Sequence, residues 1–297
     1  MSADSDRLNL ALEENIIVWG LSIPRDLLSQ TELNYIEKLP NELPDMDWVC
    51  GELDRIWFQF NLDNSKAFVD QPIGEYYSHP VWMMNGVFSA SDPASLSHRN
   101  AIAKYLKNIK PNAVADYGGG FGQLALSIAK YIPDTSIHII EPYPSKVGLH
   151  RLLGEPQIHV VSHLSINIYD AIVAQDVLEH VEDPIQLAFG ISESVCVQGR
   201  IIFANCFSPV IQSHLPSTFH LRYTFPYVMK ALGLRFIGRV HGAEHAQIFE
   251  RVGNLSLPRA RAFEFISKII GPTINWAYPI LSILYKSLRN FIKAKLD

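Results

Sequence analysis

Cysteine is scarce in this chain, which has only Cys50, Cys196 and Cys206 among its 297 residues. The three lie far apart and show no metal-ligand spacing. An odd, sparse set argues against a disulfide scaffold and for a reducing compartment. The opening segment "MSADSDRLNLALEEN" also lacks the apolar stretch of a secretory signal. These absences together predict a cytoplasmic protein.

Positive charge is scarce in the first third of the chain. Residues 1–100 contain 6 Lys and Arg against 16 Asp and Glu, a net charge of −10. Proteins that grip nucleic acid need a basic surface. The composition therefore predicts that the chain has no nucleic-acid partner.

The end of the chain has the opposite bias, with 8 Lys and Arg against 2 acids in residues 251–297. It is uncharged over residues 269–285, but glycine and prolines interrupt this stretch, which is shorter than the about 20 apolar residues that span a bilayer. We predict that residues 253–297 form a basic amphipathic extension. Three placements stay open for it: against its own domain, against a second subunit in a homodimer, or peripherally on the inner face of a membrane.

Residues 1–92 are acidic and aromatic and carry no chemical motif, and we predict helices and loops that form an N-terminal cap. The segment "YYSHPVWMMNGVF" at residues 76–88 is either a lid that contacts a ligand through Tyr76, Tyr77 and Trp82 or ordinary core packing. Asp92 before Pro93 is a helix N-cap signal, which predicts a helix over residues 93–108.

From residue 112 the chain alternates between short apolar runs and helical segments. Such alternation is typical of βαβ units, and it predicts an α/β fold with a parallel sheet covered on both faces. The last two runs, "LRFIGRV" and "HAQIFERV", are separated by a short turn. Two strands joined in this way pair antiparallel, so the sheet is predicted to end in a hairpin over residues 234–252.

The stretch "ADYGGGFGQLAL" at residues 115–126 reads as a strand, a glycine turn and a helix. Glycines let a backbone approach a ligand closely, and the helix N-terminus offers free N–H groups. Gly120-x-Gly122-x-x-Ala125 satisfies the dinucleotide fingerprint, and Glu141 follows where a carboxylate can bind ribose hydroxyls. The turn alone therefore leaves a nicotinamide site open.

Asp116, two positions before Gly118, argues against a nicotinamide site. A carboxylate in the turn would repel a pyrophosphate, whereas it suits a ligand with an ammonium group. With "IIEP" at the end of the next strand and "YDAIVAQDVLEH" further on, "VADYGGGFG" resembles the class I S-adenosylmethionine-dependent methyltransferases over about residues 93–252. The resemblance implies a Rossmann-like, seven-stranded and mostly parallel sheet with an antiparallel last strand, and S-adenosyl-L-methionine as cofactor.

The resemblance also implies roles for residues of the motifs. Glu141 would accept both ribose hydroxyls, and Asp116 would face the methionine amino end. The remaining cofactor contacts are the glycines of the turn, for methionine and ribose, and two residues near the methyl group: Gly118, Gly120, Gly122, Gln175 and Asp176. An acid that holds adenine in many relatives is replaced here by Ser162 or His163.

Histidines supply the candidates for a general base. His220, in the long segment after residue 205, is the first candidate, with an ordinary surface histidine as the alternative. His180 is the second, with a role in shaping the pocket as the alternative, and Asp176 and Glu179 could instead cap the next helix. His241 and His245 are expected to fall across a hairpin turn, so no metal site is predicted.

The sequence thus predicts a methyltransferase that acts in line on an oxygen or nitrogen of a small-molecule, natural-product or glycan acceptor. Two alternatives stay open. One is a non-catalytic binding protein with a degenerate cofactor fold, which the missing adenine acid keeps in play. The other is an NAD-dependent oxidoreductase.

Overall fold

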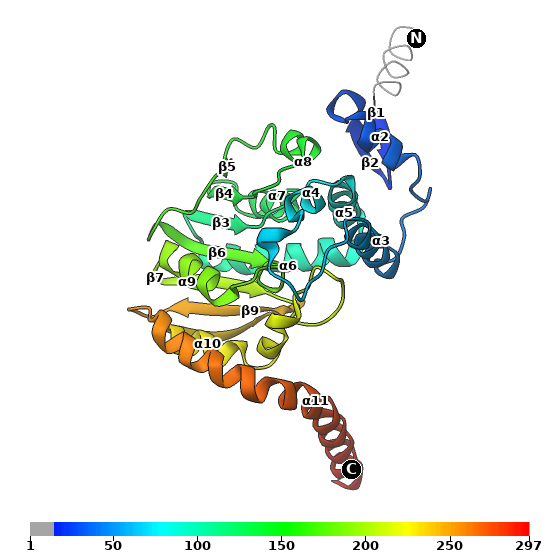
Figure 1. Cartoon of the computed structure of the whole chain (residues 1–297). Coiled ribbons are helices and arrows are strands. Elements are labelled where there is room, and N and C mark those ends of the chain that lie inside the picture. Colours follow the sequence, from blue (N-terminus) through cyan, green and yellow to red (C-terminus); the bar gives the residue numbers. More distant parts are fainter. Residues whose placement is uncertain (1–14, 297) are drawn as a thin grey trace, which may run out of the picture.

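The computed structural model describes residues 15–296, and from residue 279 onward it describes the backbone alone. The prediction about a secretory signal and the first part of the predicted cap lie outside these residues. A seven-stranded sheet forms the centre of the molecule, and helices cover both of its faces (Figure 1). Its strands are β3 (Ala113–Tyr117), β4 (Ser136–Ile140), β5 (Ile158–Val161), β6 (Tyr169–Gln175), β7 (Val195–Ala204), β8 (Leu234–Val240) and β9 (Ala243–Arg251).

The strand order is β5-β4-β3-β6-β7-β9-β8. The first five strands are parallel, and β9 runs antiparallel to both β7 and β8. The predicted α/β fold, with a mostly parallel sheet of seven strands and an antiparallel terminal hairpin, is confirmed. Because the chain moves outward from β3 to β5 and then returns to β6, the order reverses between β3 and β6. Ligands of open α/β sheets bind at such a reversal, beyond the carboxyl ends of the strands.

Two apolar layers hold the sheet, since alternate residues of a strand face opposite sides. In β6, Ile172 packs toward α9 (Pro184–Ser194) and α10 (Phe225–Leu232). Its neighbour Val173 packs toward α6 (Pro93–Ile109) and α7 (Gln123–Tyr131). Both side chains are fully buried. The helix α6 confirms the prediction for residues 93–108, and Asp92 caps it by accepting a hydrogen bond from the Ser95 N–H at 2.7 Å.

The cap contains α2 (Gln30–Ile36), α3 (Met46–Gln59), α4 (Ile73–Tyr77) and α5 (Pro80–Ser91). The prediction of helices and loops alone is wrong at its start, where β1 (Asn15–Val18) and β2 (Leu21–Pro24) form an antiparallel hairpin. The physical reason is the Trp19–Gly20 turn. Both residues have positive φ, 48° and 84°, which matches the tight turns that join twisted strands.

After β9, the chain forms a single helix, α11 (Leu257–Leu296). Its first half packs against α10, α9 and the 3-10 helix η4 (Pro216–Leu221). Arg261 forms ion pairs with Asp183 and with Glu264 there. This half therefore packs on the chain's own domain. Within the part of the chain that the structure describes, no helix has both the length and the apolar character needed to cross a bilayer. Contact with a membrane surface or a second subunit stays a prediction.

Candidate functional site

The glycine turn leaves β3 between the ends of β4 and β6. Gly118 and Gly119 donate their N–H groups to the carbonyl of Ile140 in β4, at 2.8 and 3.4 Å. Gly118 has a φ of +71°, and a Cβ on it would lie 2.5 Å from a methyl group of Val177. This position therefore requires glycine both for its backbone conformation and for the space that Val177 occupies.

Glu141 directly follows β4, and its side chain forms a hydrogen bond with the glycine turn. Its Oε2 accepts a hydrogen bond from the Gly120 N–H at 2.7 Å, and its Oε1 accepts one from the Tyr143 N–H at 2.9 Å. A carboxylate has lone pairs for about four hydrogen bonds, so both oxygens keep capacity to accept from a ligand. The predicted ribose acid is thus fixed in orientation beside the glycines.

Asp116 lies beneath the turn. Its side chain is 2% exposed, and its Oδ2 atom is buried without a hydrogen-bond partner in the described structure. A Cβ on Gly119 would lie 3.0 Å from this oxygen. Burial raises the pKa of Asp116 to about 7, although the positive charge of Arg99 opposes the rise. The turn therefore covers a carboxyl group that has no full compensation for its charge.

Arg99, which lies in α6, belongs to this region although no sequence motif predicts it. Its guanidinium donates to the carbonyl of Ser89 at 3.3 Å. Burial lowers its pKa, while the charges of Asp176 and Asp116 raise it. Arg99 is 19 residues before Gly118 and is separated from it by the rest of α6 and by β3, so it reaches the site only through the packing of the fold.

Gln175 and Asp176 come at the end of β6, next to the glycine turn. The Gln175 amide donates to Oδ2 of Asp176 at 3.2 Å, and the Oε1 atom of Gln175 is buried without a partner in the described structure. Asp176 has a φ of +53°, a left-handed conformation that is uncommon outside glycine. Such conformations persist where the surroundings fix them, and they concentrate at functional sites.

A buried polar group follows directly. Glu179 is fully buried, and its Oε1 accepts from the Cys206 N–H at 2.6 Å. Burial, with a further contribution from Asp176, holds the pKa of Glu179 well above its ordinary range. The helix α9 is capped by Asp183, whose Oδ1 accepts from the Gln186 N–H. The cap that was left open for Asp176 or Glu179 is therefore supplied by another residue.

His180, the second base candidate, lies in the same short segment. Its Nδ1 is 3.1 Å from the carbonyl of Ser213, and its ring centroid is 4.8 Å from that of His214. Burial lowers the pKa of His180 to about 3 and also lowers the pKa of His214. Both rings are therefore neutral at neutral pH. The structure brings His214, from the long segment after β7, to the carboxyl end of β6.

His220, the first base candidate, lies in η4 and faces α11. It is 7% exposed, so the alternative of a surface histidine is wrong. Its Nδ1 is 2.8 Å from the carbonyl of Ser217, and its own carbonyl accepts a hydrogen bond from the Ser267 hydroxyl at 3.1 Å. Burial lowers its pKa. These contacts do not join it to the glycine turn, and its role as a base stays a prediction.

Aromatic side chains of the cap reach the same region. Tyr77 stacks on Tyr143 with ring centroids 5.7 Å apart, and Trp82 contacts the ring of His180 edge-on at 6.4 Å. The Tyr77 hydroxyl and the Trp82 N–H are buried without partners within the described residues. Tyr76 belongs to the apolar core of the cap, against which Tyr77 and Trp82 also pack. Two of the three predicted lid residues thus lie beside the glycine turn and the histidines.

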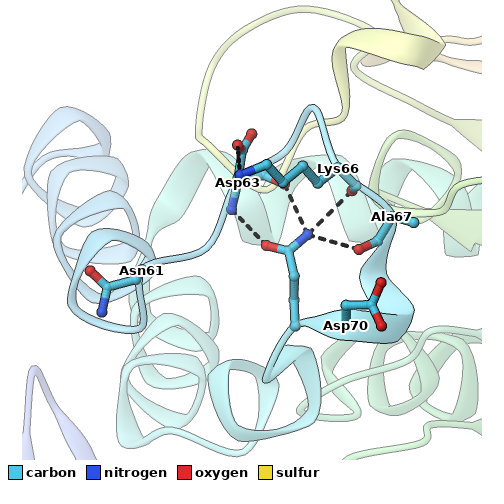
Figure 2. A pocket seen from close by; sticks show the side chains of 6 residues that line it. Asn61, Asp63, Lys66, Ala67 and Asp70 are labelled. Atoms are coloured by element: carbon cyan, nitrogen blue, oxygen red, sulfur yellow. Dashed lines mark hydrogen bonds and ion pairs between the residues drawn. The ribbon is translucent and has the colours of Figure 1, made fainter.

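A hollow on the surface of the cap lies in the loop before α4 (Figure 2). Its lining residues are Asn61, Asp63, Lys66, Ala67, Asp70 and Gln71. The Gln71 amide donates to the carbonyls of Asp63 and Ala67, both at 3.0 Å, and accepts from the Asp63 N–H. These polar groups are used to hold the loop in shape, so the hollow is a feature of the loop rather than a ligand site.

The remaining predicted residues lie after β5 and around the turn between β8 and β9. Ser162 and His163 are exposed after β5 and form a hydrogen bond with each other at 2.8 Å. His241 lies in the turn between β8 and β9, and His245 lies within β9. The prediction that these two histidines fall across a hairpin turn is confirmed.

Comparison with known proteins gave matches among solved structures only. No family model and no curated protein sequence matches the chain. The mitomycin 7-O-methyltransferase is 16% identical at a TM-score of 0.48, with 67% of this chain and 68% of that chain covered.

Two further structures are similar over more of the chain. Human N-acetylserotonin methyltransferase in complex with SAM is 16% identical at a TM-score of 0.48, covering 85% and 84% of the two chains. An O-methyltransferase family protein from Burkholderia thailandensis is 9% identical at a TM-score of 0.46, covering 84% and 82%. With TM-scores below 0.5, these likenesses carry no argument about function, which must come from the residues of this chain.

Proposed function

We propose that this chain is a class I S-adenosylmethionine-dependent methyltransferase. The observation that carries the proposal is the position of Glu141. Its carboxylate is fixed by the N–H groups of Gly120 and Tyr143 at the carboxyl end of β4, beside a turn that requires glycine. Two carboxylate oxygens held in this way suit a vicinal diol. The reversal of strand order next to this turn, with an antiparallel last strand, supports the same family.

The residues around the turn fit the cofactor that the family implies. Asp116 and Gln175 each have a buried oxygen without a partner among the described residues. A cationic ammonium group suits Asp116, whose charge a pyrophosphate would oppose. Glu141 would hold the ribose of the cofactor. The glycines would leave room for the ribose and the methionine part of the cofactor. Gln175 and Asp176 would lie near the methyl group.

The bound cofactor supplies an activated methyl group on a sulfonium, so the hard chemistry belongs to it. The chain's own residues hold the acceptor and exclude water. Orientation of this kind contributes roughly 7–11 kcal/mol in well-positioned systems. A general base works best with a pKa near the working pH, and burial takes the pKa of His180 to about 3. We therefore rank positioning above acid–base work, and we do not assign His180 as a general base.

We propose an oxygen or nitrogen of a small-molecule, natural-product or glycan acceptor as the methyl acceptor. Tyr77, Trp82 and Tyr143 give this region aromatic faces, and the segment after β7 adds His214. Flat aromatic surfaces with a few polar groups are typical of small-molecule sites. The segment around residues 76–82 acts in this proposal as the lid of the acceptor site.

The test is calorimetry with S-adenosylhomocysteine on the native chain and on Glu141→Ala. The loss of hydrogen bonds to a charged group should weaken binding by about 1.5–3 kcal/mol. Glu42→Ala, which removes an exposed carboxylate of the cap, serves as the matched control and should bind like the native chain. Equal binding by Glu141→Ala and the native chain would contradict the ribose assignment.

The same preparation separates the two alternatives. A nicotinamide enzyme would be protected by NAD(H) in a thermal shift and not by S-adenosylhomocysteine. A non-catalytic protein with a degenerate cofactor fold would bind nothing at the site, or would bind S-adenosylhomocysteine but transfer no labelled methyl group into cell extract. Transfer of the label would also identify the acceptor.

A further inference from the structure

We infer that Glu179, His180 and His214 form a binding site for a divalent transition-metal ion at the carboxyl end of β6. One oxygen of Glu179 and one ring nitrogen of each histidine lie within 4.8 Å of one another. Two imidazoles and a carboxylate are a common set of ligands for such ions. No local spacing indicates this set, because His180 and His214 are far apart in the chain.

The hydrogen bonds of the two histidines fix which ring nitrogen is free to bind an ion. Nδ1 of His180 is 3.1 Å from the carbonyl of Ser213, and Nδ1 of His214 is 2.7 Å from the carbonyl of Ser208. A carbonyl only accepts, so in both rings Nδ1 carries the proton and donates it. Nε2 is then the unprotonated nitrogen of each ring. Metal-binding histidines are held by this same arrangement, in which the other ring nitrogen donates to a carbonyl or carboxylate.

The buried carboxyl group of Glu179 also supports a bound cation. Its side chain is 0% exposed, and its Oε2 atom has no hydrogen-bond partner among the residues described. Its other oxygen is held by the Cys206 N–H at 2.6 Å. Burying a carboxylate is costly unless a charge or hydrogen bonds compensate it. A cation between Oε2 and the two rings would supply that compensation.

The ligand set selects the kind of ion. Imidazole nitrogen suits Zn²⁺, Co²⁺ and Fe²⁺, whereas Mg²⁺ and Ca²⁺ prefer oxygen ligands. With metal–ligand bonds of about 2.0–2.2 Å, ligands of a tetrahedral ion lie about 3.4 Å apart, so an ion would draw these three side chains slightly closer. Three protein ligands leave at least one position open, as in catalytic rather than structural metal sites.

The open position gives the ion a role in the reaction, and this step rests on the proposed function. Asp176, the residue proposed to lie near the methyl group, comes three positions before Glu179, directly after β6. A hydroxyl group of the acceptor bound to the ion would lose its proton to water more readily. The site therefore favours a hydroxyl oxygen over a nitrogen as the methyl acceptor.

The test is metal binding by the full chain after treatment with a chelator, with ZnCl₂, CoCl₂ and MgCl₂ as separate probes. Calorimetry should show one Zn²⁺ per chain, and Co²⁺ should give the visible absorption of an ion bound to imidazole and carboxylate. Mg²⁺ should bind far more weakly. His214→Ala and Glu179→Gln should each weaken Zn²⁺ binding by about 100-fold or more, beyond the 10–100-fold effect of changing the partners of a ligand.

His241→Ala is the matched control, because His241 is fully exposed in the β8–β9 turn, and it should bind Zn²⁺ like the native chain. The proposal is overturned if the native chain binds no Zn²⁺ at 100-fold molar excess, a result that needs no variant. It is also overturned if folded His214→Ala retains native affinity. S-adenosylhomocysteine binding measured without metal reports on the proposed function separately, so failure of one proposal is distinguishable from failure of the other.

Discussion

At the scale of single residues, the site is a set of acidic groups in places where water is excluded. Asp116 and Glu179 are both buried, and each has one oxygen without a partner in the described structure. Burial is the largest cause of the raised pKa of both groups. Burying a carboxyl group without partners for both oxygens costs free energy in the folded chain. These two placements are explained if ligands with positive charge bind beside them.

The pKa of Asp116 makes the stability of the free chain depend on pH. The folded value is about 7, against about 3.9 in an unfolded chain. Between these values the folded state keeps a proton that the unfolded state has lost, so the contribution of Asp116 to stability is full below about pH 4 and falls as the pH rises toward 7.

Asp116→Asn removes this titration. We expect the free energy of unfolding of the native chain, relative to the variant, to fall by about 2–3 kcal/mol from pH 5 to pH 8. Urea unfolding at the two pH values measures the difference. Asp134→Asn, at an exposed position, should show no such change, and a pH-independent difference for Asp116→Asn would contradict the assignment.

At the scale of elements, helix and strand boundaries follow from local signals. The Asp92 cap and the Pro93 that follows it start α6 at the predicted residue. This helix precedes the glycine turn and carries Arg99. The cap at Asp92 therefore helps to fix the helix that positions Arg99.

We expect Asp92→Ala to lower the free energy of unfolding by about 1 kcal/mol, because the Ser95 N–H loses its acceptor. Urea unfolding measures the loss. Asp92→Asn keeps an acceptor oxygen in the same place and should unfold close to the native chain. If the alanine and asparagine variants were equally stable, the side-chain cap would not be the cause.

Much of the sheet could be predicted from the sequence, because its strands are short apolar runs separated by helices, and the terminal hairpin was predicted over residues 234–252, where β8 and β9 lie. The β1–β2 hairpin could not, since its turn is formed by Trp19, a residue with no turn preference, beside Gly20. The cofactor residues follow motifs that are contiguous in the chain. Arg99 and His214 reach the site only through tertiary packing, and neither has a local signal.

At the scale of the whole molecule, α11 is attached by a close contact rather than by apolar burial alone. A Cβ on Gly271 would lie 2.6 Å from the carbonyl oxygen of His220 in η4. The Thr224 hydroxyl donates to the same carbonyl at 2.7 Å. The helix therefore approaches the domain at a point where only a hydrogen atom fits.

We expect Gly271→Ala to destabilise the fold by about 1–3 kcal/mol, the range for an added carbon in a packed contact. Thermal or urea unfolding measures this change. Gly190→Ala is the matched helical control, because a Cβ there meets nothing within 4 Å, and it should be neutral or slightly stabilising. Equal effects of the two substitutions would contradict the contact.

The 40 residues of α11 have one more consequence. At 1.5 Å per residue the helix is about 60 Å long, and its last part projects beyond the globular body (Figure 1). A rod fixed to a globule tumbles and diffuses like a larger particle. Elution volume in gel filtration then depends on shape as well as mass. A monomer of 33.5 kDa would elute early, at a volume expected for a dimer. Light scattering, which weighs the particle directly, is the measurement that counts its subunits.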